Sequence, residues 1–224
     1  MPKNGHFART AGDHTTPRPP PLSSLAEPLK HSSWYREVMP EALPLSLHPL
    51  LGSRWSPTTF DPKHEVTSAE VALLIEAARW APSAGNSQPW AFLVGRRGDG
   101  VHERLIQYLT PSSARWASTA SLLLANLSRR YVEDTDWEYS EFALYDLGQA
   151  VAQLTIQARA LGLFVRQFRA FDREGIAAEF AVPPHWEVTT MAAVGQIPDG
   201  FQPGDDVPSR ERRTIDALIW PVSS

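Results

Sequence analysis

The chain has 224 residues, of which 42% are hydrophobic and 21% are charged, so it can bury one sizeable core. Its formal net charge is −4 at pH 7, and this balance makes nucleic acid or an anionic membrane surface an unexpected partner. The sequence contains no cysteine, which excludes disulfide bonds, thiolate nucleophiles and cysteine-ligated zinc or iron–sulfur clusters. Any redox chemistry must therefore be carried by a cofactor.

The N-terminal segment, residues 1–46, is expected to form an extended or disordered tail. Residues 1–49 contain nine of the twenty prolines, with little apolar periodicity between them. A proline-rich docking motif is the alternative interpretation. We expect one globular domain over 47–224. No apolar run approaches the ~18–20 residues of a membrane span, and the N-terminus lacks the apolar region of a secretory signal, so we expect a cytoplasmic protein.

The first helix is predicted over 68–80. Thr67 and Glu70 have the spacing of a capping box at its start. Apolar residues then recur at the i, i+3, i+4 and i+7 positions of one helix face, namely Val71, Leu74, Ile75 and Ala78.

A rigid polar loop is predicted directly after this helix, at 81–90. It combines two prolines, Gly85 and four small polar side chains, which suit hydrogen bonding more than a packed core. The apolar run at 91–95 that follows predicts a buried strand. A plain helix-to-strand connector and a ligand-holding loop are both open interpretations of the residue types.

The remaining elements are read from apolar periodicity and from start and stop signals. The segment 122–127 favours a strand, although its leucines and alanines also suit a helix. The long amphipathic helix ends at Gly162, and Asp172 is a candidate cap. The predicted elements are helix 101–109, strand 122–127, helix 143–161, strand 164–168, helix 173–181 and strand 187–195.

A basic cluster at 210–213 precedes a short apolar run at the C-terminus, and an Arg-x-Ser run occurs at 54–56. Taken alone, both patterns are typical of solvated arginines. The histidines show no spacing typical of metal ligands, and no nucleotide-binding or nucleophile motif is present.

The helix end Glu76–Trp80 and the run Pro82–Trp90 together resemble the signature of the FMN-dependent nitroreductase family. The resemblance extends over 50–220. It implies an α+β fold, in which a mixed, mainly antiparallel sheet is flanked by helices. It also implies a homodimer with two FMN sites at the subunit interface, a central helix at 143–161, and a last strand that reaches across to the partner.

The resemblance also implies roles for particular residues. Arg54 and Ser56 would contact the FMN phosphate, as would Arg212 or Arg213, because guanidinium groups and hydroxyls suit a dianion. The main chain of the turn at 169–170 would approach flavin N5. The implied cofactor-binding residues are Arg54, Trp55, Ser56, Thr58, Pro82, Ser83, Ala84, Asn86, Gln88, Arg169, Ala170, Arg212 and Arg213. No catalytic side chain and no metal ligand is implied.

The chain departs from the family pattern at several points. Thr58 stands where relatives often carry a basic residue, and Ser113 is the nearest equivalent of an asparagine that reaches the flavin. Arg115 is a second candidate for that contact. Arg169 and Ala170 replace glycines, so two alternatives are open: their side chains clash if φ is positive, or a guanidinium lies by the ring.

The resemblance implies an oxidoreductase that passes electrons from NAD(P)H through flavin N5 to a nitroaromatic, quinone or similar small-molecule acceptor. The departures leave a second interpretation open, an FMN-binding or sequestering protein with little turnover. A third interpretation, an interaction module without a cofactor, leaves the loop at 82–90 unexplained.

Overall fold

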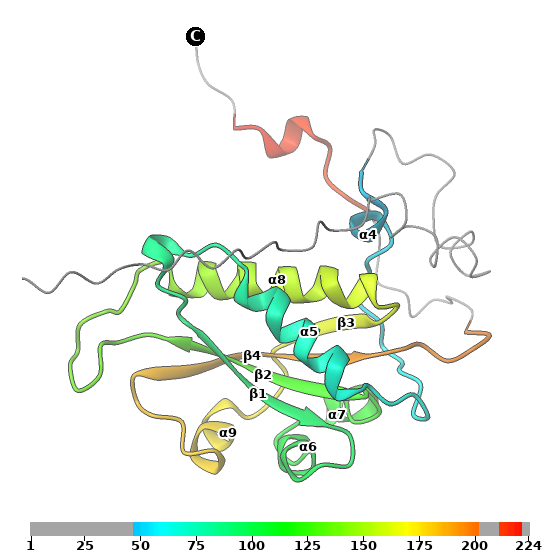
Figure 1. Cartoon of the computed structure of the whole chain (residues 1–224), viewed down its shortest axis with the longest axis horizontal. Coiled ribbons are helices and arrows are strands. Elements are labelled where there is room, and N and C mark those ends of the chain that lie inside the picture. The colour runs from blue at the N-terminus through cyan, green and yellow to red at the C-terminus, as the bar shows by residue number, and fades with distance from the viewer. Residues whose placement is uncertain (1–46, 202–210, 221–224) are drawn as a thin grey trace, which may run out of the picture.

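The structure is a computed structural model that describes residues 47–201 and 211–220. The predicted tail at 1–46 lies outside the described residues. The described chain is an α+β protein with one four-stranded sheet between two layers of helices (Figure 1). No helix in these ranges is long and apolar enough to cross a membrane.

The sheet consists of β1 (Trp90–Arg96), β2 (Leu122–Arg129), β4 (Trp186–Gly195) and β3 (Phe164–Phe168), in that spatial order. Every pair of neighbouring strands in the described chain is antiparallel. The expected mixed sheet is therefore not observed in these residues. The connections from β1 to β2 and from β3 to β4 each start and end at the same end of the sheet. The two strands that each connection joins therefore run in opposite directions. The strands β1 and β3 form the two edges.

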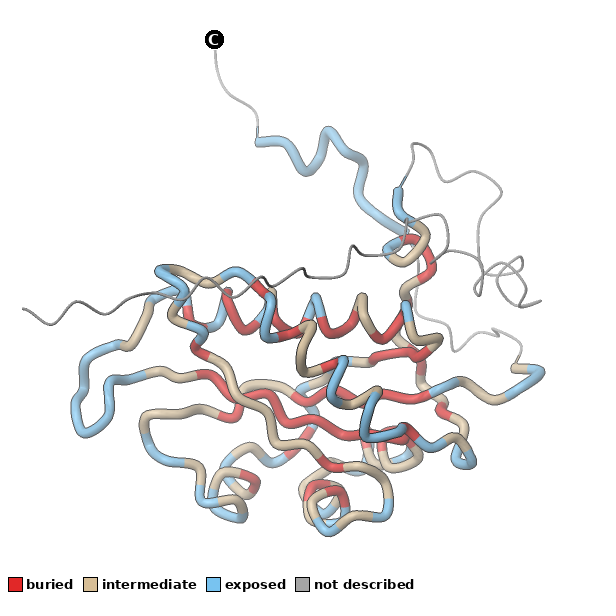
Figure 2. The backbone as a smooth tube through the Cα atoms, in the orientation of Figure 1, coloured by how far each residue is buried: buried red, intermediate tan, exposed pale blue. Residues whose placement is uncertain are grey.

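Helices cover both faces of the sheet. On one face lie α5 (Ser68–Arg79) and α8 (Ala143–Ala160), and on the other lie α6 (Gly100–Ile106), α7 (Pro111–Ala117) and α9 (Arg173–Glu179) (Figure 1). Two apolar cores result, one on each face. Figure 2 shows β2 and the second half of β4 as buried segments between these layers.

The strand β2 explains why its sequence is apolar without alternation. Leu122 and Leu124 pack toward α8, whereas Leu123 and Ala125 pack into the opposite core. Because both faces are covered, both sets of side chains must be apolar. The strand interpretation of 122–127 is confirmed.

The first helix and the central helix are confirmed. At α5, Thr67 Oγ1 accepts the Glu70 N–H at 3.2 Å, and Glu70 Oε2 accepts the Thr67 N–H at 2.7 Å, which is the predicted capping box. The helix α8 runs from 143 to 160, and Gly162 follows it with φ +78°, the left-handed conformation that ends many helices. The strands predicted at 91–95, 164–168 and 187–195 are also observed, with β1 and β4 slightly longer.

Other element boundaries differ from the prediction. The helix predicted over 101–109 starts at Gly100, where Asp99 caps it, and ends at Ile106. The helix predicted over 173–181 ends at Glu179. The helix α7 was not predicted, although Pro111 at its first position is a recognised start signal. A short helix, α4 (Pro49–Gly52), precedes the Arg-x-Ser run.

The C-terminal stretch 211–220 contains one short 3₁₀ turn, η2 (Asp216–Leu218), and no strand. All ten of its residues are exposed, and it stands apart from the body of the chain (Figure 2). The last strand implied by the resemblance is therefore not formed in this stretch, because a strand needs a neighbour and none lies alongside it here.

Candidate functional site

A cavity of about 360 Å³ opens beside the C-terminal half of α8, a volume within the range of small-ligand sites. Two of the predicted residues, Arg54 and Ser56, line it. The other wall comes from α8 and from the edge strand β3. The lining residues are Leu51, Arg54, Ser56, Ala152, Thr155, Ile156, Val165 and Gln167.

The segment 54–56 is fixed by its middle residue. The Trp55 ring is 4% exposed and packs against Phe164 and Phe201, with ring centroids 5.5 Å and 6.1 Å away. Side chains alternate along extended backbone, so Arg54 and Ser56 face away from the core. The guanidinium of Arg166 also donates to the Ser56 carbonyl at 3.1 Å. Trp55 therefore positions its neighbours, and its ring does not line the cavity as a cofactor contact would.

The cavity end formed by Arg54 is electropositive. One Arg54 N–H lies 3.5 Å from Ser56 Oγ, which accepts it. Burial lowers the pKa of the Arg54 guanidinium below its ordinary value, and the positive charge of Arg212 lowers it further. Arg212 therefore lies close enough to repel Arg54, and an anion bound between them would relieve that repulsion. Both arginines of the C-terminal stretch bond to main-chain carbonyls near them, Arg212 to that of Glu211 and Arg213 to that of Ala217.

The turn at 169–170 follows β3, two residues beyond Gln167 of the cavity wall. Neither Arg169 nor Ala170 has a positive φ, so replacing glycine brings no left-handed strain. The Ala170 carbonyl accepts from Thr110 N at 3.3 Å, Thr110 Oγ1 at 3.1 Å and Ser113 Oγ at 2.5 Å. Three donors on one oxygen hold the turn against the start of α7, and the Arg169 side chain stays exposed, 5.1 Å from the Phe171 ring.

Three further residues occupy positions where the resemblance implies, or lacks, a flavin contact. Ser113 is 1% exposed, and its hydroxyl donates to the Ala170 carbonyl, so it supports the turn and does not face a ligand as expected. Arg115 is exposed on α7. Thr58 is half-buried, two residues after Ser56, and brings no charge to the cavity.

The polar loop at 82–88 has an unusual main-chain conformation. Gly85, Asn86 and Gln88 have φ values of +58°, +56° and +48°. The 3₁₀ turn η1 (Ala84–Asn86) forms its centre. Ser83 closes the loop, because its carbonyl accepts from Asn86 N and its Oγ accepts from Gln88 N, both at 3.0 Å. Gly85, Asn86 and Gln88 are consequently presented to solvent, and so is Pro82.

Two residues that were not predicted anchor this loop. Asp146, in the first turn of α8, accepts the Ala84 N–H at 3.0 Å, and the Tyr139 hydroxyl donates to the Ser87 carbonyl at 3.0 Å. Asp146 is 2% exposed. The helix period places Asp146 on the buried side of α8, with Ala143 and Ala150, but nothing in the sequence indicates its partner in the loop.

The predicted site residues thus form two groups, one toward each end of α8 (Figure 1). The cavity with Arg54 uses Ala152, Thr155 and Ile156, whereas the loop at 82–88 is bonded to Asp146. Helix residues rise about 1.5 Å each, so Asp146 and Thr155 are about 14 Å apart along the helix axis. One chain alone does not bring the two groups together.

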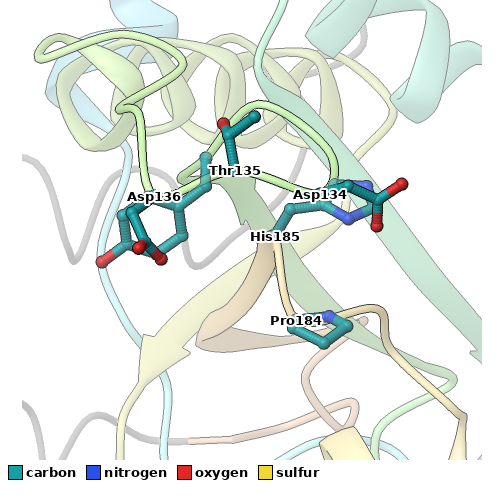
Figure 3. Close-up of a pocket in the computed structure, with 6 residues that line it drawn as sticks. Asp134, Thr135, Asp136, Pro184 and His185 are labelled. Carbon is teal, nitrogen blue, oxygen red and sulfur yellow. The ribbon is translucent and has the colours of Figure 1, made fainter.

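Another cavity, of about 370 Å³, lies at the tip of the connection between β2 and α8 (Figure 3). It is lined by Tyr131, Asp134, Thr135, Asp136, Pro184 and His185, none of which was predicted for the site. Within the described ranges, no cluster of three or more His, Cys, Asp or Glu side chains could hold a metal ion. This polar hollow is open, and no described side chain links it to the cavity near Arg54.

Comparison with known proteins gives a consistent result. The model of the family described as "Nitroreductase family" matches residues 51–121, which include the Arg-x-Ser run and the 82–88 loop. The 5,6-dimethylbenzimidazole synthase of Rhodospirillum rubrum is 30% identical over 158 residues, covering 59% of this chain and 74% of that protein. The Bacillus subtilis protein YdgI, which has the provisional name of an NAD(P)H nitroreductase, is 27% identical over 184 residues, covering 67% and 88%.

Solved structures of similar fold give the same result. A crystal structure described as an oxidoreductase containing FMN superposes with a TM-score of 0.72 at 27% identity, covering 80% of this chain and 93% of that one. An enone reductase of gut-bacterial fatty acid saturation, CLA-ER, superposes with a TM-score of 0.67 at 17% identity, covering 81% and 100%. The second likeness concerns the fold alone.

Proposed function

We propose that this chain, which belongs to the nitroreductase family of oxidoreductases, binds FMN and transfers electrons from NAD(P)H to a small acceptor such as a nitroaromatic or a quinone. The name of the structural relative that contains FMN supports the cofactor. The name of YdgI supports a nicotinamide donor.

The observation that carries the proposal is the pair of Arg54 and Ser56 on the wall of the cavity. Arg54 and Ser56 line it, and the charge of Arg212 acts on Arg54. A phosphate monoester carries up to two negative charges and accepts hydrogen bonds from both guanidinium groups and hydroxyls. The donor set therefore fits the phosphate of FMN.

The remaining wall residues fit the rest of such a ligand. Thr155 and Gln167 bring polar groups to the cavity, with Gln167 Nε2 3.3 Å from Thr155 Oγ1, while Val165 and Ile156 bring apolar surface. The turn at 169–170, held by Thr110 and Ser113, follows this wall two residues beyond Gln167. When bound, FMN would supply the hydride transfer that no side chain of this protein can perform. The protein's own part is to bind, orient and provide positive charge.

A homodimer is part of the proposal. The outer side of α8 carries exposed Leu144, Tyr145 and Ala152, and Leu73 of α5 and Leu51 of α4 are also about half exposed. A groove of about 350 Å³ with mostly apolar and amide lining runs along α8 beside the Arg54 cavity. Exposed apolar side chains along a groove are typical of an interface, which supports a dimer packed through α8.

Two-fold symmetry would also complete the site. In a symmetric dimer packed through α8, the helices run antiparallel when the symmetry axis crosses the middle of the helix. The loop at 82–88 of one chain would then approach the Arg54 cavity of its partner. The exposed Ile215, Leu218 and Trp220 of the C-terminal stretch would gain cover from the partner in the same way.

The test is the colour and composition of the purified protein. We expect a yellow protein that releases FMN on heating, that is bleached by NADH or NADPH, and that is reoxidised by a nitroaromatic or quinone. Sedimentation should give about twice the chain mass of 24.9 kDa. A colourless protein that takes up no added FMN would reject the proposal, and a monomer that retains tight FMN would reject the shared site.

The half-buried Thr58 favours a second candidate function, FMN binding with little turnover. A cation near the flavin would stabilise the negative charge of its reduced form, and Thr58 supplies none. Tight FMN binding without reduction by either nicotinamide would support this candidate over the reductase.

A further inference from the structure

We infer that Asp146 is a positioning residue, which fixes the loop at 82–88 of one chain for the cofactor held by its partner. The inference rests on the proposed function, because it takes the FMN site to be shared between two chains. Asp146 itself touches neither cofactor nor substrate, since its side chain is buried and faces the inner side of the loop.

The chemistry of Asp146 is unusual for its position. A carboxylate loses hydration when it is buried, so it needs polar partners there. Its described partners are the Ala84 N–H at 3.0 Å and the Gln149 side-chain amide at 3.4 Å, and neither carries a charge. The N-terminal end of α8 adds a favourable dipole interaction. An apolar side chain at this buried position would avoid the cost of removing a carboxylate from water, but it could not accept the hydrogen bond from the loop.

The loop needs such an anchor because its conformation is strained. Asn86 and Gln88 hold left-handed backbone angles, which residues with a β-carbon rarely adopt unless their surroundings impose them. Ala84 is the first residue of the 3₁₀ turn that leads into this region. Its bond to a carboxylate is charge-assisted, and such bonds are roughly twice as strong as neutral ones. The Asp146 contact is therefore the strongest fixed point at the start of the turn.

Asp146 also links the loop to the proposed interface. It belongs to α8, whose opposite, exposed side carries Tyr145 and Ala152. Because the loop is bonded to the helix that packs on the partner, its position relative to the partner's cavity is set by the helix packing. If the loop were held only by hydrogen bonds within its own turn, helix packing would not set its position relative to the partner's cavity.

The first experiment compares Asp146→Ala and Asp146→Asn with Asp99→Ala. Asp99 is the matched control, since it also accepts main-chain N–H groups, from Arg96 at 2.9 Å and His102 at 2.7 Å, but at the start of α6. We expect Asp146→Ala to raise the Kd for FMN about 10-fold or more. Asp146→Asn keeps an acceptor oxygen and should lose less. Asp99→Ala should lower the melting temperature and leave FMN affinity unchanged.

The second experiment pairs two differently tagged chains, one with Asp146→Ala and one with Arg54→Ala. In a heterodimer, one site combines the intact Arg54 of the first chain with the intact loop of the second, and the other site combines both defects. We expect each heterodimer to have one FMN site of wild-type affinity, and each mutant homodimer to have only sites of weakened affinity. If the loop served its own chain, no site of the heterodimer would bind with wild-type affinity.

The outcomes separate this inference from the proposed function. Wild-type FMN affinity in Asp146→Ala, measured well below its melting temperature, overturns the inference alone. A heterodimer without a wild-type site also overturns it. If Asp146→Ala does not fold, the affinity of Asp146→Asn decides, and equality with wild type again overturns the inference. A wild-type protein that binds no FMN overturns the proposed function, and the inference falls with it.

Discussion

At the C-terminal end of α8 the candidate site offers charged side chains, whereas at its N-terminal end it offers main chain held in an unusual shape. Arg54 and Ser56 flank Trp55, whose buried ring fixes this segment in place. The loop at 82–88 has no charged side chain, and contacts with Asp146 and Tyr139 fix its shape. The first group can bind an anion by charge alone, while the second can act only if its geometry is preserved.

The largest expected effect is on the charged group. Arg54→Ala removes a charge-assisted contact with phosphate, which costs about 1.5–3 kcal/mol, or a ~10- to 100-fold rise in the Kd for FMN. Thr58→Ala, four residues further on, removes no charge and should change the Kd little. Titration of both variants with FMN tests this. Equal affinities would show that the phosphate binds elsewhere.

The next effect concerns the loop, where shape matters and charge does not. Gly85 has φ +58° and nothing within 4 Å of an added β-carbon, so Gly85→Ala meets no steric obstacle and costs only backbone strain, about 1 kcal/mol. We expect stability to fall by that amount and FMN affinity to fall up to ~5-fold. Gly100→Ala is the control, because Gly100 also has open space but no positive φ. Urea unfolding and FMN titration measure both effects. Identical behaviour of the two variants would mean that the loop conformation is not strained.

An effect of similar size follows from adding charge near Ser56. Thr58→Lys places a cation two residues after Ser56, where it would stabilise reduced flavin by about 1 kcal/mol at surface-like separation. The rate of flavin reduction by NADPH or NADH should rise about 5-fold. Stopped-flow reduction and potentiometry check this. Unchanged kinetics with intact FMN binding would show that position 58 faces away from the flavin.

The smallest effect on either group is expected from pH, because arginines and main chain do not titrate near neutrality. The stability of the fold, in contrast, should depend on pH. Burial lowers the pKa values of His64 and His102 below their ordinary values, so the folded state favours their neutral forms. This contribution to stability is present above the ordinary histidine pKa and is lost as the pH falls below it.

The free energy of unfolding of the FMN-free protein should therefore decrease from pH 7 to pH 5. The Nε2 atom of His102 is buried and has no hydrogen-bond partner among the described residues. His102→Leu should accordingly flatten the decline, as urea unfolding at several pH values would show. An unchanged pH profile in this variant would place the effect on His64 or elsewhere.

The sequence predicted most of the fold because the main elements carry local signals. The capping box at Thr67, the apolar period of α8 and the glycine after it each specify one element from neighbouring residues. The helix α7 was missed because only Pro111 marks its start, and the serines that follow suit loops equally well. The C-terminal strand came from the resemblance and is not formed in the described chain.

The site was predicted less completely than the fold. Arg54 and Ser56 were identified through the family resemblance, and the structure places both on the wall of one cavity. Asp146 and Tyr139 were missed because their bonds to the loop join residues 62 and 52 positions apart in the chain. Such contacts leave no local pattern. Whether Arg169 and Ala170 are strained depends on their φ angles, which the sequence does not specify for residues other than proline.

The edge position of β1 affects how the protein behaves at high concentration. No described strand pairs with its outer side, and its central residues, Ala91–Val94, are apolar and only half-buried. The other edge strand, β3, carries Arg166 and Gln167, which discourage further pairing. An apolar edge with open main-chain groups is a template on which another molecule can add a strand. Aggregation through β1 is therefore the expected route of loss during purification and storage, and a lysine introduced at position 91 should slow it.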